Sequence, residues 1–342
     1  PELAVLLAYT KNELVADLLE GSLPDDPELE STLRDYFPRP LIERFVDQVP
    51  QHPLRREIVA SQVANRVVND AGVTFGHRLS METAASAEEL ARAHLIASAV
   101  VDRATISGDI DELDLAVPAE AQLEMRLDLR TLVERAARWF VLTRPAPLDL
   151  SREIGFLAAP VQALMASLPD LLVGRPAEQA SRRVAELTEA GVPDELARVV
   201  SVLPFSAAAF NVAEIALRHD VGVAETMLVH LAAGELLDLE PLQQRITALP
   251  RDDRWQTMAR AALRDELSAV HAGITEAVVT TTEPGDGHQR VATWINRDHE
   301  TVARAGRLLA EVLEEEAADL PRLSVGLRAV RTLLTERAGD PD

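Results

Sequence analysis

Apolar residues recur every three or four positions along almost the whole chain, and this spacing constrains the fold more than any other feature. It places an apolar stripe along one side of an α-helix, and that stripe must pack against a neighbour. No stretch shows the alternation of apolar and polar residues that is typical of a strand. We therefore expect an all-α fold, a multi-helix bundle, with helices over roughly residues 2–20, 27–36, 38–48, 53–71, 86–104, 118–142, 151–167, 176–190, 193–203, 206–219, 222–234, 240–249, 252–280, 289–318 and 321–337.

The residues between these stretches indicate how the helices are grouped. The run Thr143-Arg144-Pro145-Ala146-Pro147 is the clearest break, because proline disfavours a continuous helix. We expect either one bundle or two packed helical subdomains that divide here, an N-terminal one of residues 1–144 and a C-terminal one of residues 148–338, followed by a disordered tail, residues 339–342. No repeat of fixed length is visible, which argues against a solenoid.

The composition limits both the core and the partners. Hydrophobic residues make up 47% of the chain and aromatic residues only 4%, so the core must consist mainly of Leu, Val, Ile and Ala. The formal net charge of −22 argues against nucleic acid or an anionic membrane surface as a partner. No apolar run approaches the length of a transmembrane helix. The absence of cysteine fits a reducing cytoplasm.

Two basic residues fall on apolar helix faces and are candidates for buried ion pairs. Lys11 is the only lysine, and on a helical wheel it lies on the same stripe as Leu14 and Leu18. Arg56 points toward the apolar side of the helix over residues 53–71. Because buried charges are usually paired, we expect a carboxylate partner for Arg56, and for Lys11 either a carboxylate or an extended path to solvent. The alternative for Lys11 is a functional lysine with a lowered pKa.

The helix over residues 53–71 also carries an unusual polar face. Amides and arginines line one arc of it, opposite valines and alanines, although asparagine is a mediocre helix former. Two interpretations remain open, a solvated surface and a hydrogen-bonding contact with another domain. The candidate interdomain contact consists of Arg55, Gln62, Asn65, Arg66 and Asn69.

Motifs for catalysis, cofactor binding or metal binding are weak. The eight histidines form no HExxH motif and no pair at i, i+4 spacing. Gly285-Asp286-Gly287 begins like a dinucleotide-binding motif, but Arg290 stands where the third glycine belongs. The pairs Asp25-Asp26 and Asp252-Asp253 have no third carboxylate at a spacing suited to magnesium. We therefore predict no catalytic, cofactor-binding or metal-binding residue, and a helical metalloenzyme is the least favoured function.

Several short segments in about the first 140 residues form a distinctive pattern that can be compared with known families. They are Pro1-Glu2-Leu3-Ala4-Val5-Leu6-Leu7-Ala8-Tyr9-Thr10-Lys11, Asp35-Tyr36-Phe37-Pro38, His52-Pro53-Leu54-Arg55-Arg56-Glu57-Ile58, Ala64-Asn65, Val68-Asn69, Gly72-Val73-Thr74-Phe75, Val117-Pro118-Ala119 and Arg135-Ala136-Ala137-Arg138-Trp139. Together they resemble the start of the C-terminal region of the large bacterial NAD-dependent glutamate dehydrogenases. Beyond these residues the resemblance is one of length and helix content only.

The resemblance implies a longer parent chain with N-terminal regulatory modules, a central dehydrogenase part and a closing helical region, and the absence of a start methionine before Pro1 fits this. The parent would oxidise L-glutamate to 2-oxoglutarate and ammonia and reduce NAD. The active-site lysines and glycine-rich turn of such enzymes cannot be placed on a chain with one lysine and no predicted strand.

We therefore expect a non-catalytic segment that holds no cofactor, in a parent enzyme that uses NAD. Its expected partners are the catalytic and N-terminal regions of the same polypeptide, in a cytoplasmic homo-oligomer. A stand-alone helical interaction or scaffold protein is the alternative.

Overall fold

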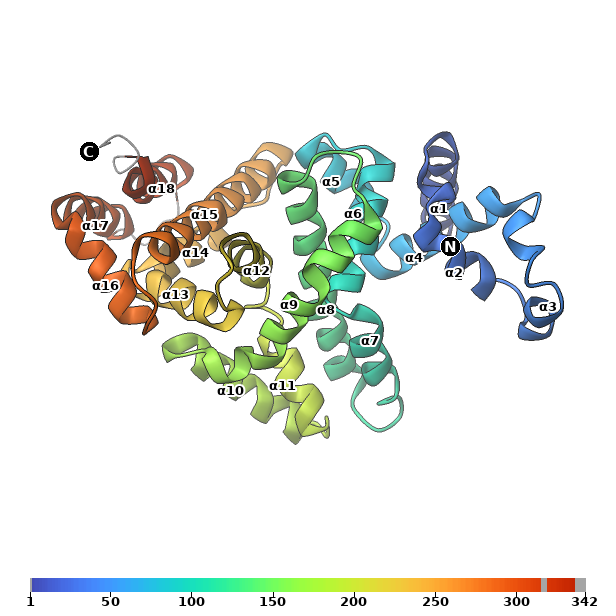
Figure 1. The fold of residues 1–342 in the computed structure, drawn as a ribbon, viewed down its shortest axis with the longest axis horizontal. Helices are drawn as coiled ribbons and strands as arrows, with labels where there is room; N and C mark the ends of the chain where they lie inside the picture. The colour runs from blue at the N-terminus through green and yellow to red at the C-terminus, as the bar shows by residue number, and fades with distance from the viewer. Residues whose placement is uncertain (1, 315–318, 336–342) are drawn as a thin grey trace. The chain divides into compact units, whose positions relative to one another are not determined.

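The computed structural model describes residues 2–314 and 319–335, and every regular element in these ranges is a helix (Figure 1). The prediction of an all-α, multi-helix fold is confirmed. The chain forms two compact units, one of Pro1–Gln162 with Glu178–Ala207 and one of Ala163–Ala177 with Ala208–Asp342. The predicted division at residues 143–147 falls within the first unit. The tail of residues 339–342 lies outside the described residues.

The first unit is built around α6 (Ala87–Val100), which is buried on almost all sides. Ten of its 14 residues are buried, which is expected only for a helix surrounded by others. Ser86 caps its first turn: the Ser86 side chain accepts a hydrogen bond from Glu89 N, while the Glu89 carboxylate accepts one from Ser86 N. Helices α4, α5 and α8 lie against it (Figure 1).

The other elements of the first unit precede and follow α6 along the chain. Helix α9 ends, and helix α10 begins, in the second unit. The elements are α1 (Glu2–Glu20), η1 (Leu23–Asp25), η2 (Pro27–Leu29), α2 (Glu30–Asp35), α3 (Arg39–Arg44), η3 (Val49–Gln51), α4 (Arg55–Ala71), α5 (Phe75–Thr83), α7 (Arg103–Asp111), α8 (Ala119–Thr143), α9 (Leu150–Leu171), α10 (Gly174–Glu189) and α11 (Asp194–Val202).

The second unit has a separate core of aliphatic side chains around one tryptophan. Leu242, Ile274, Val278 and Trp294 are almost completely buried in it. This agrees with the expectation that a chain with few aromatic residues builds its core from aliphatic ones. Its helices are α12 (Ala208–His219), α13 (Val223–Leu236), α14 (Leu239–Ala248), α15 (Arg254–Thr281), α16 (Gly287–Arg297), α17 (His299–Leu313) and α18 (Leu320–Thr335).

The largest differences from the predicted helix boundaries lie in three places. The helix predicted over residues 86–104 ends at Val100, because Asp102 takes a left-handed conformation with φ 51°, and most of α7 lies beyond the predicted range. The helix predicted over residues 289–318 divides at Asp298, whose side chain caps α17 by accepting a hydrogen bond from Thr301 N at 3.1 Å. Helix α5 was not predicted at all. Both interruptions use a single aspartate, a weaker sequence signal than proline or glycine.

Helix α9 is the one described helix that is long and apolar enough to cross a membrane. An apolar helix of this length was not predicted from the sequence. Its buried residues, however, follow a single stripe that includes Leu157, Val161, Leu164 and Leu168. One-sided burial of this kind is typical of a helix that lies on a protein core.

Candidate functional site

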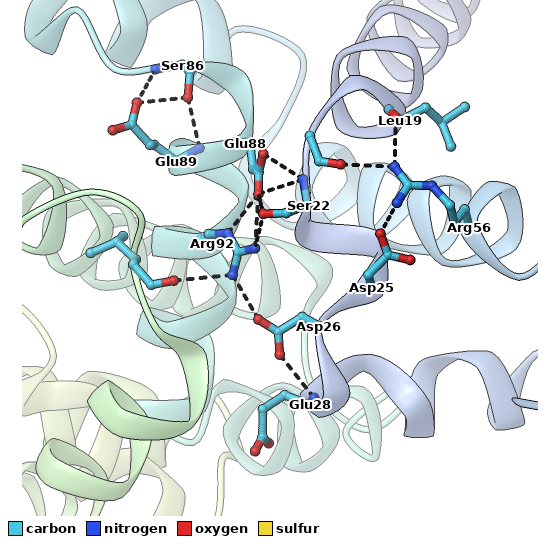
Figure 2. Close-up of polar contacts among 12 residues, drawn as sticks. Leu19, Ser22, Asp25, Asp26, Glu28, Arg56, Ser86, Glu88, Glu89 and Arg92 are labelled. Atoms are coloured by element: carbon cyan, nitrogen blue, oxygen red, sulfur yellow. Dashed lines mark hydrogen bonds and ion pairs between the residues drawn. The ribbon is translucent and has the colours of Figure 1, made fainter.

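Polar side chains from three elements meet where the chain turns after α1 and reaches α4 and α6 (Figure 2). Only two residues separate the end of α1 from the start of η1. The turn therefore places Ser22, Asp25 and Asp26 between α4 and α6 (Figure 2). We call this group of side chains the α1–α4–α6 junction. It consists of Ser22, Asp25, Asp26, Arg56, Glu88 and Arg92.

Arg92 lies at the centre of the junction and is only 7% exposed. Its Nη1 donates to Asp26 Oδ2 at 2.8 Å and to the Leu148 carbonyl at 3.2 Å. Its Nη2 donates to Ser22 Oγ at 3.1 Å, and its Nε donates to Glu88 Oε1 at 3.0 Å. The guanidinium is therefore surrounded by acceptors, as a buried charge requires.

Glu88 completes the junction from the α6 side. It accepts hydrogen bonds from Ser22 N at 3.1 Å and from Ser22 Oγ at 2.9 Å. Burial raises the pKa of Glu88, but the hydrogen bonds from Ser22 and Arg92 together outweigh burial, so the pKa lies below its usual value. A side chain at Gly21 would collide with this carboxylate, which explains glycine at the end of α1.

Arg56 joins α4 to the same turn, and its partner is the acidic side chain of Asp25. Its Nη2 also donates to the carbonyls of Leu19 and Gly21, at 2.8 and 2.9 Å, which satisfies backbone groups at the end of α1. The Arg56 side chain is 38% exposed, so it occupies the rim of the core and not its interior. Arg55 lies 3.9 Å from Asp25 as well.

Lys11 links α1 to α4 through an amide and not through a carboxylate. Its half-buried Nζ donates to Asn69 Oδ1 at 2.8 Å. Among the other candidate contact residues, Arg66 is exposed with its Nε 4.0 Å from Asp70, while Gln62 and Asn65 are partly buried. Three members of the predicted polar face, Arg55, Arg66 and Asn69, thus lie beside partners within the chain.

A second polar cluster in the first unit was not anticipated from the sequence. Asp70 pairs with Arg103 at 2.8 Å, and Asp70 Oδ2 lies 3.6 Å from Nε2 of the buried His94. Ser98 Oγ lies 3.4 Å from the same nitrogen. A catalytic triad needs the acid and the nucleophile on opposite ring nitrogens, so this arrangement is not one. Burial lowers the pKa of His94, which favours its neutral form.

In the second unit, two histidines stack in the interior. The rings of His230 and His271 are 3.6 Å apart at 18°, and His271 Nε2 lies 2.8 Å from the His230 carbonyl. His230 Nδ1 lies 2.8 Å from Thr275 Oγ1. Burial lowers the pKa of His271 to about 4 and that of His230 well below its usual value. Both rings are therefore neutral at physiological pH.

The incomplete dinucleotide motif has a structural role. Arg290 is buried, and its Nη2 donates to the Val279 carbonyl at 2.8 Å while its Nε donates to Thr282 Oγ1 at 2.9 Å, at the end of α15. Arg290 also pairs with Glu225. Gly287 allows α16 to approach α13, since an added Cβ would lie 2.7 Å from the Leu228 carbonyl oxygen.

The aspartate pairs likewise act within the fold. Asp25 and Asp26 meet arginines, and Asp253 caps α15 by accepting a hydrogen bond from Gln256 N at 2.9 Å. No group of three or more potential metal-ligating side chains occurs within residues 2–314 and 319–335. The charged clusters described above hold helices together.

The first unit also contains a pocket of about 400 Å³. The acidic side chains that line it lie close to an arginine. Arg183 lies 2.9 Å from Glu124 and 3.8 Å from Asp128 along its wall. Burial raises the pKa of Asp128, and Arg183 opposes this shift. The lining residues are Glu124, Leu127, Asp128, Gln179, Arg183, Ser201, Pro204 and Phe205.

Comparison with known proteins gives a consistent result along the chain. The family model described as "Glutamate dehydrogenase, C-terminal" matches residues 1–332, well beyond the first 140 residues that carried the resemblance. The NAD-specific glutamate dehydrogenase of Pseudomonas aeruginosa is 34% identical over 333 residues, 97% of this chain and 21% of the relative.

The NAD-specific glutamate dehydrogenases of Halomonas elongata and Mycobacterium tuberculosis are each 33% identical to the chain. They cover 96% and 97% of it, and in both cases the match is 20% of the relative. The chain thus spans about a fifth of the length of the curated relatives it matches. From the match over residues 1–332, the chain belongs to the family of glutamate dehydrogenase C-terminal regions.

Proposed function

We propose that this chain is the non-catalytic helical region of a longer NAD-specific glutamate dehydrogenase. One observation carries the proposal: nearly the whole chain matches these enzymes, yet it corresponds to about a fifth of them, and its described residues form helices without a strand. A dinucleotide is usually held at a turn between a strand and a helix. The chemistry therefore belongs to another part of the polypeptide.

The parent reaction would convert L-glutamate, NAD⁺ and water into 2-oxoglutarate, ammonium, NADH and a proton. Hydride moves from the α-carbon of glutamate to the nicotinamide, and water replaces the amine. The segment would support this reaction by packing against the catalytic and N-terminal regions of the same polypeptide, in a cytoplasmic homo-oligomer. Helical regions of this kind can bias domain closure and subunit contacts.

The test compares the full-length enzyme with this segment, each supplied with glutamate and NAD. NADH formation followed at 340 nm should occur with the full-length chain and stay at the blank rate with the segment. Circular dichroism of the segment should show a helical spectrum, so that inactivity does not reflect unfolding. NADH production by the folded segment alone would contradict the proposed division of labour.

The polar face of α4 is one proposed contact with the rest of the enzyme. Asn65 and Arg55 are the residues to substitute, and Asn65→Ala is the cleaner change because Arg55 also lies near Asp25. We expect either substitution in the full-length enzyme to alter kcat, KM or oligomeric mass. Glu13→Ala on α1, an exposed change outside this face, is the control. Unchanged kinetics and mass for both variants would rule this contact out.

A further inference from the structure

The first turns of α1 are apolar on every side and yet exposed. Leu3 is 68% exposed, Val5 52%, Leu6 56% and Tyr9 66%. Consecutive residues on a helix point in directions about 100° apart, so these four side chains share an arc of about 160°. Ala4 and Ala8, which are exposed, and Leu7, which is half-buried, complete the circumference. We call these four residues the α1 apolar tip. An isolated helix end with this composition leaves a large apolar surface in contact with water.

The exposure of large apolar side chains is confined to the first half of α1. Leu18, near its end, is completely buried, and Lys11 marks the point where α1 begins to bond to α4. No charged residue stands between Glu2 and Lys11. A helix that is apolar on all sides is normally enclosed by protein or lipid, so the tip suits insertion into an apolar cleft better than contact with a flat surface.

We infer that the α1 apolar tip inserts into the part of the longer polypeptide that lies outside this segment. This inference rests on the proposed function and specifies the contact. Its occupant follows from the relatives: about four-fifths of their length lies outside the matched segment, and the matching family is the C-terminal one.

Charge argues against lipid as the occupant. Helices that lie in a membrane surface combine an apolar face with lysines and arginines that meet anionic headgroups. The chain has a net charge of −22, and Lys11 is the only basic residue in α1. An apolar cleft in the same polypeptide needs no such charge.

The direct test places a photo-reactive phenylalanine derivative at Leu6 in the full-length enzyme. Leu123 on α8, which is 57% exposed, is the matched control position. We expect the probe at position 6 to cross-link to peptides outside this segment of the same chain, and the probe at position 123 to do so far less. Mixed isotope-labelled copies distinguish contacts within one chain from contacts between copies.

Four results would overturn the inference: cross-links to a second copy, cross-links to lipid, cross-links restricted to this segment, or equal yields at positions 6 and 123. Glutamate oxidation by the same preparation is measured separately. Activity without the expected cross-links would contradict the docking contact but not the proposed function. Cross-links without activity would contradict the proposed function but not the docking contact.

A pair of serine substitutions gives a second, independent measurement. Leu3→Ser with Leu6→Ser should raise the rate at which protease releases this segment from the full-length enzyme by about tenfold for each leucine, the scale expected for exposing a buried leucine. Leu123→Ser with Leu142→Ser is the control, since these leucines are also at least half exposed. An unchanged release rate in the first variant would overturn the inference.

Discussion

Buried arginines perform the main electrostatic work at the scale of single residues. Arg92 and Arg290 each serve several acceptors on different elements, and Arg138 pairs with the buried Glu82. The planar guanidinium presents five donors in fixed directions, which suits sites where a loop and two helices must be held together. The scarcity of lysine therefore does not weaken these contacts, since a lysine ammonium group could not supply this geometry.

Removing Arg92 should test this role directly. Arg92→Ala leaves Asp26 and Glu88 without their buried partner, and breaking such a pair costs about 3–5 kcal/mol. We expect a decrease of this size in the free energy of unfolding, measured with urea. Arg198→Ala is the matched control, because Arg198 and Asp194 form an exposed i, i+4 pair, and it should cost about 0.5 kcal/mol or less. Equal effects would contradict the assigned role of Arg92.

At the scale of elements, the packing of α16 against α13 depends on a close approach between the two helix backbones. Gly287, the first residue of α16, faces the Leu228 backbone of α13. Backbone cannot move aside as a flexible side chain can, so a larger residue must push the helices apart. By contrast, Gly306 on α17 has open space around its Cα.

Alanine substitutions at these two glycines should change the stability of the protein in opposite directions. Gly287→Ala should destabilise the protein by about 1–3 kcal/mol, the usual cost of forcing extra atoms into a packed site. Gly306→Ala should stabilise it by up to about 1 kcal/mol, because alanine is the better helix former and nothing is displaced. Thermal unfolding of both variants and the wild type provides the measurement. A stable Gly287→Ala variant would show that α13 and α16 are not fixed at this point.

The stability of the whole molecule should depend on pH through the stacked histidines. In the unfolded chain each histidine titrates near its usual pKa, whereas the folded His271 has a pKa of about 4. Between these values the unfolded state binds more protons than the folded state. The stabilisation is therefore complete above pH 6.5, falls as the pH drops toward 4, and changes little below that.

A pH series of urea unfolding checks this window. The loss for His271 should be at most about 3 kcal/mol between pH 6.5 and 4, and less in practice because part of its surface is exposed. His271→Gln, which retains a donor for the His230 carbonyl, should flatten the curve in this range. Thr280→Ser, an exposed change on the same helix that involves no ionisable group, is the control. Identical slopes for wild type and His271→Gln would exclude His271 as the source of the pH dependence.

Periodicity alone was enough to predict the helical class and most long helices, including α4 and α8, because a buried apolar stripe is a local pattern. The capping pair Ser86 and Glu89 is likewise a local pattern, since the two residues are three positions apart. The resemblance in the first 140 residues reached the correct family. Local signals also indicated that Arg56 needed an acidic partner, but they could not name Asp25.

Partners far apart in the chain were decided by tertiary structure alone. Asp70 meets Arg103 and His94, Ser22 meets Glu88, and Lys11 meets Asn69, because packing of the helices brings them together. Nothing in the spacing of these residues encodes the meeting. The sequence by itself thus determined which faces are apolar and where helices run, since these depend on neighbouring residues. Only the tertiary structure decided which charges are paired and that the apolar start of α1 is left uncovered, since both depend on how the helices pack.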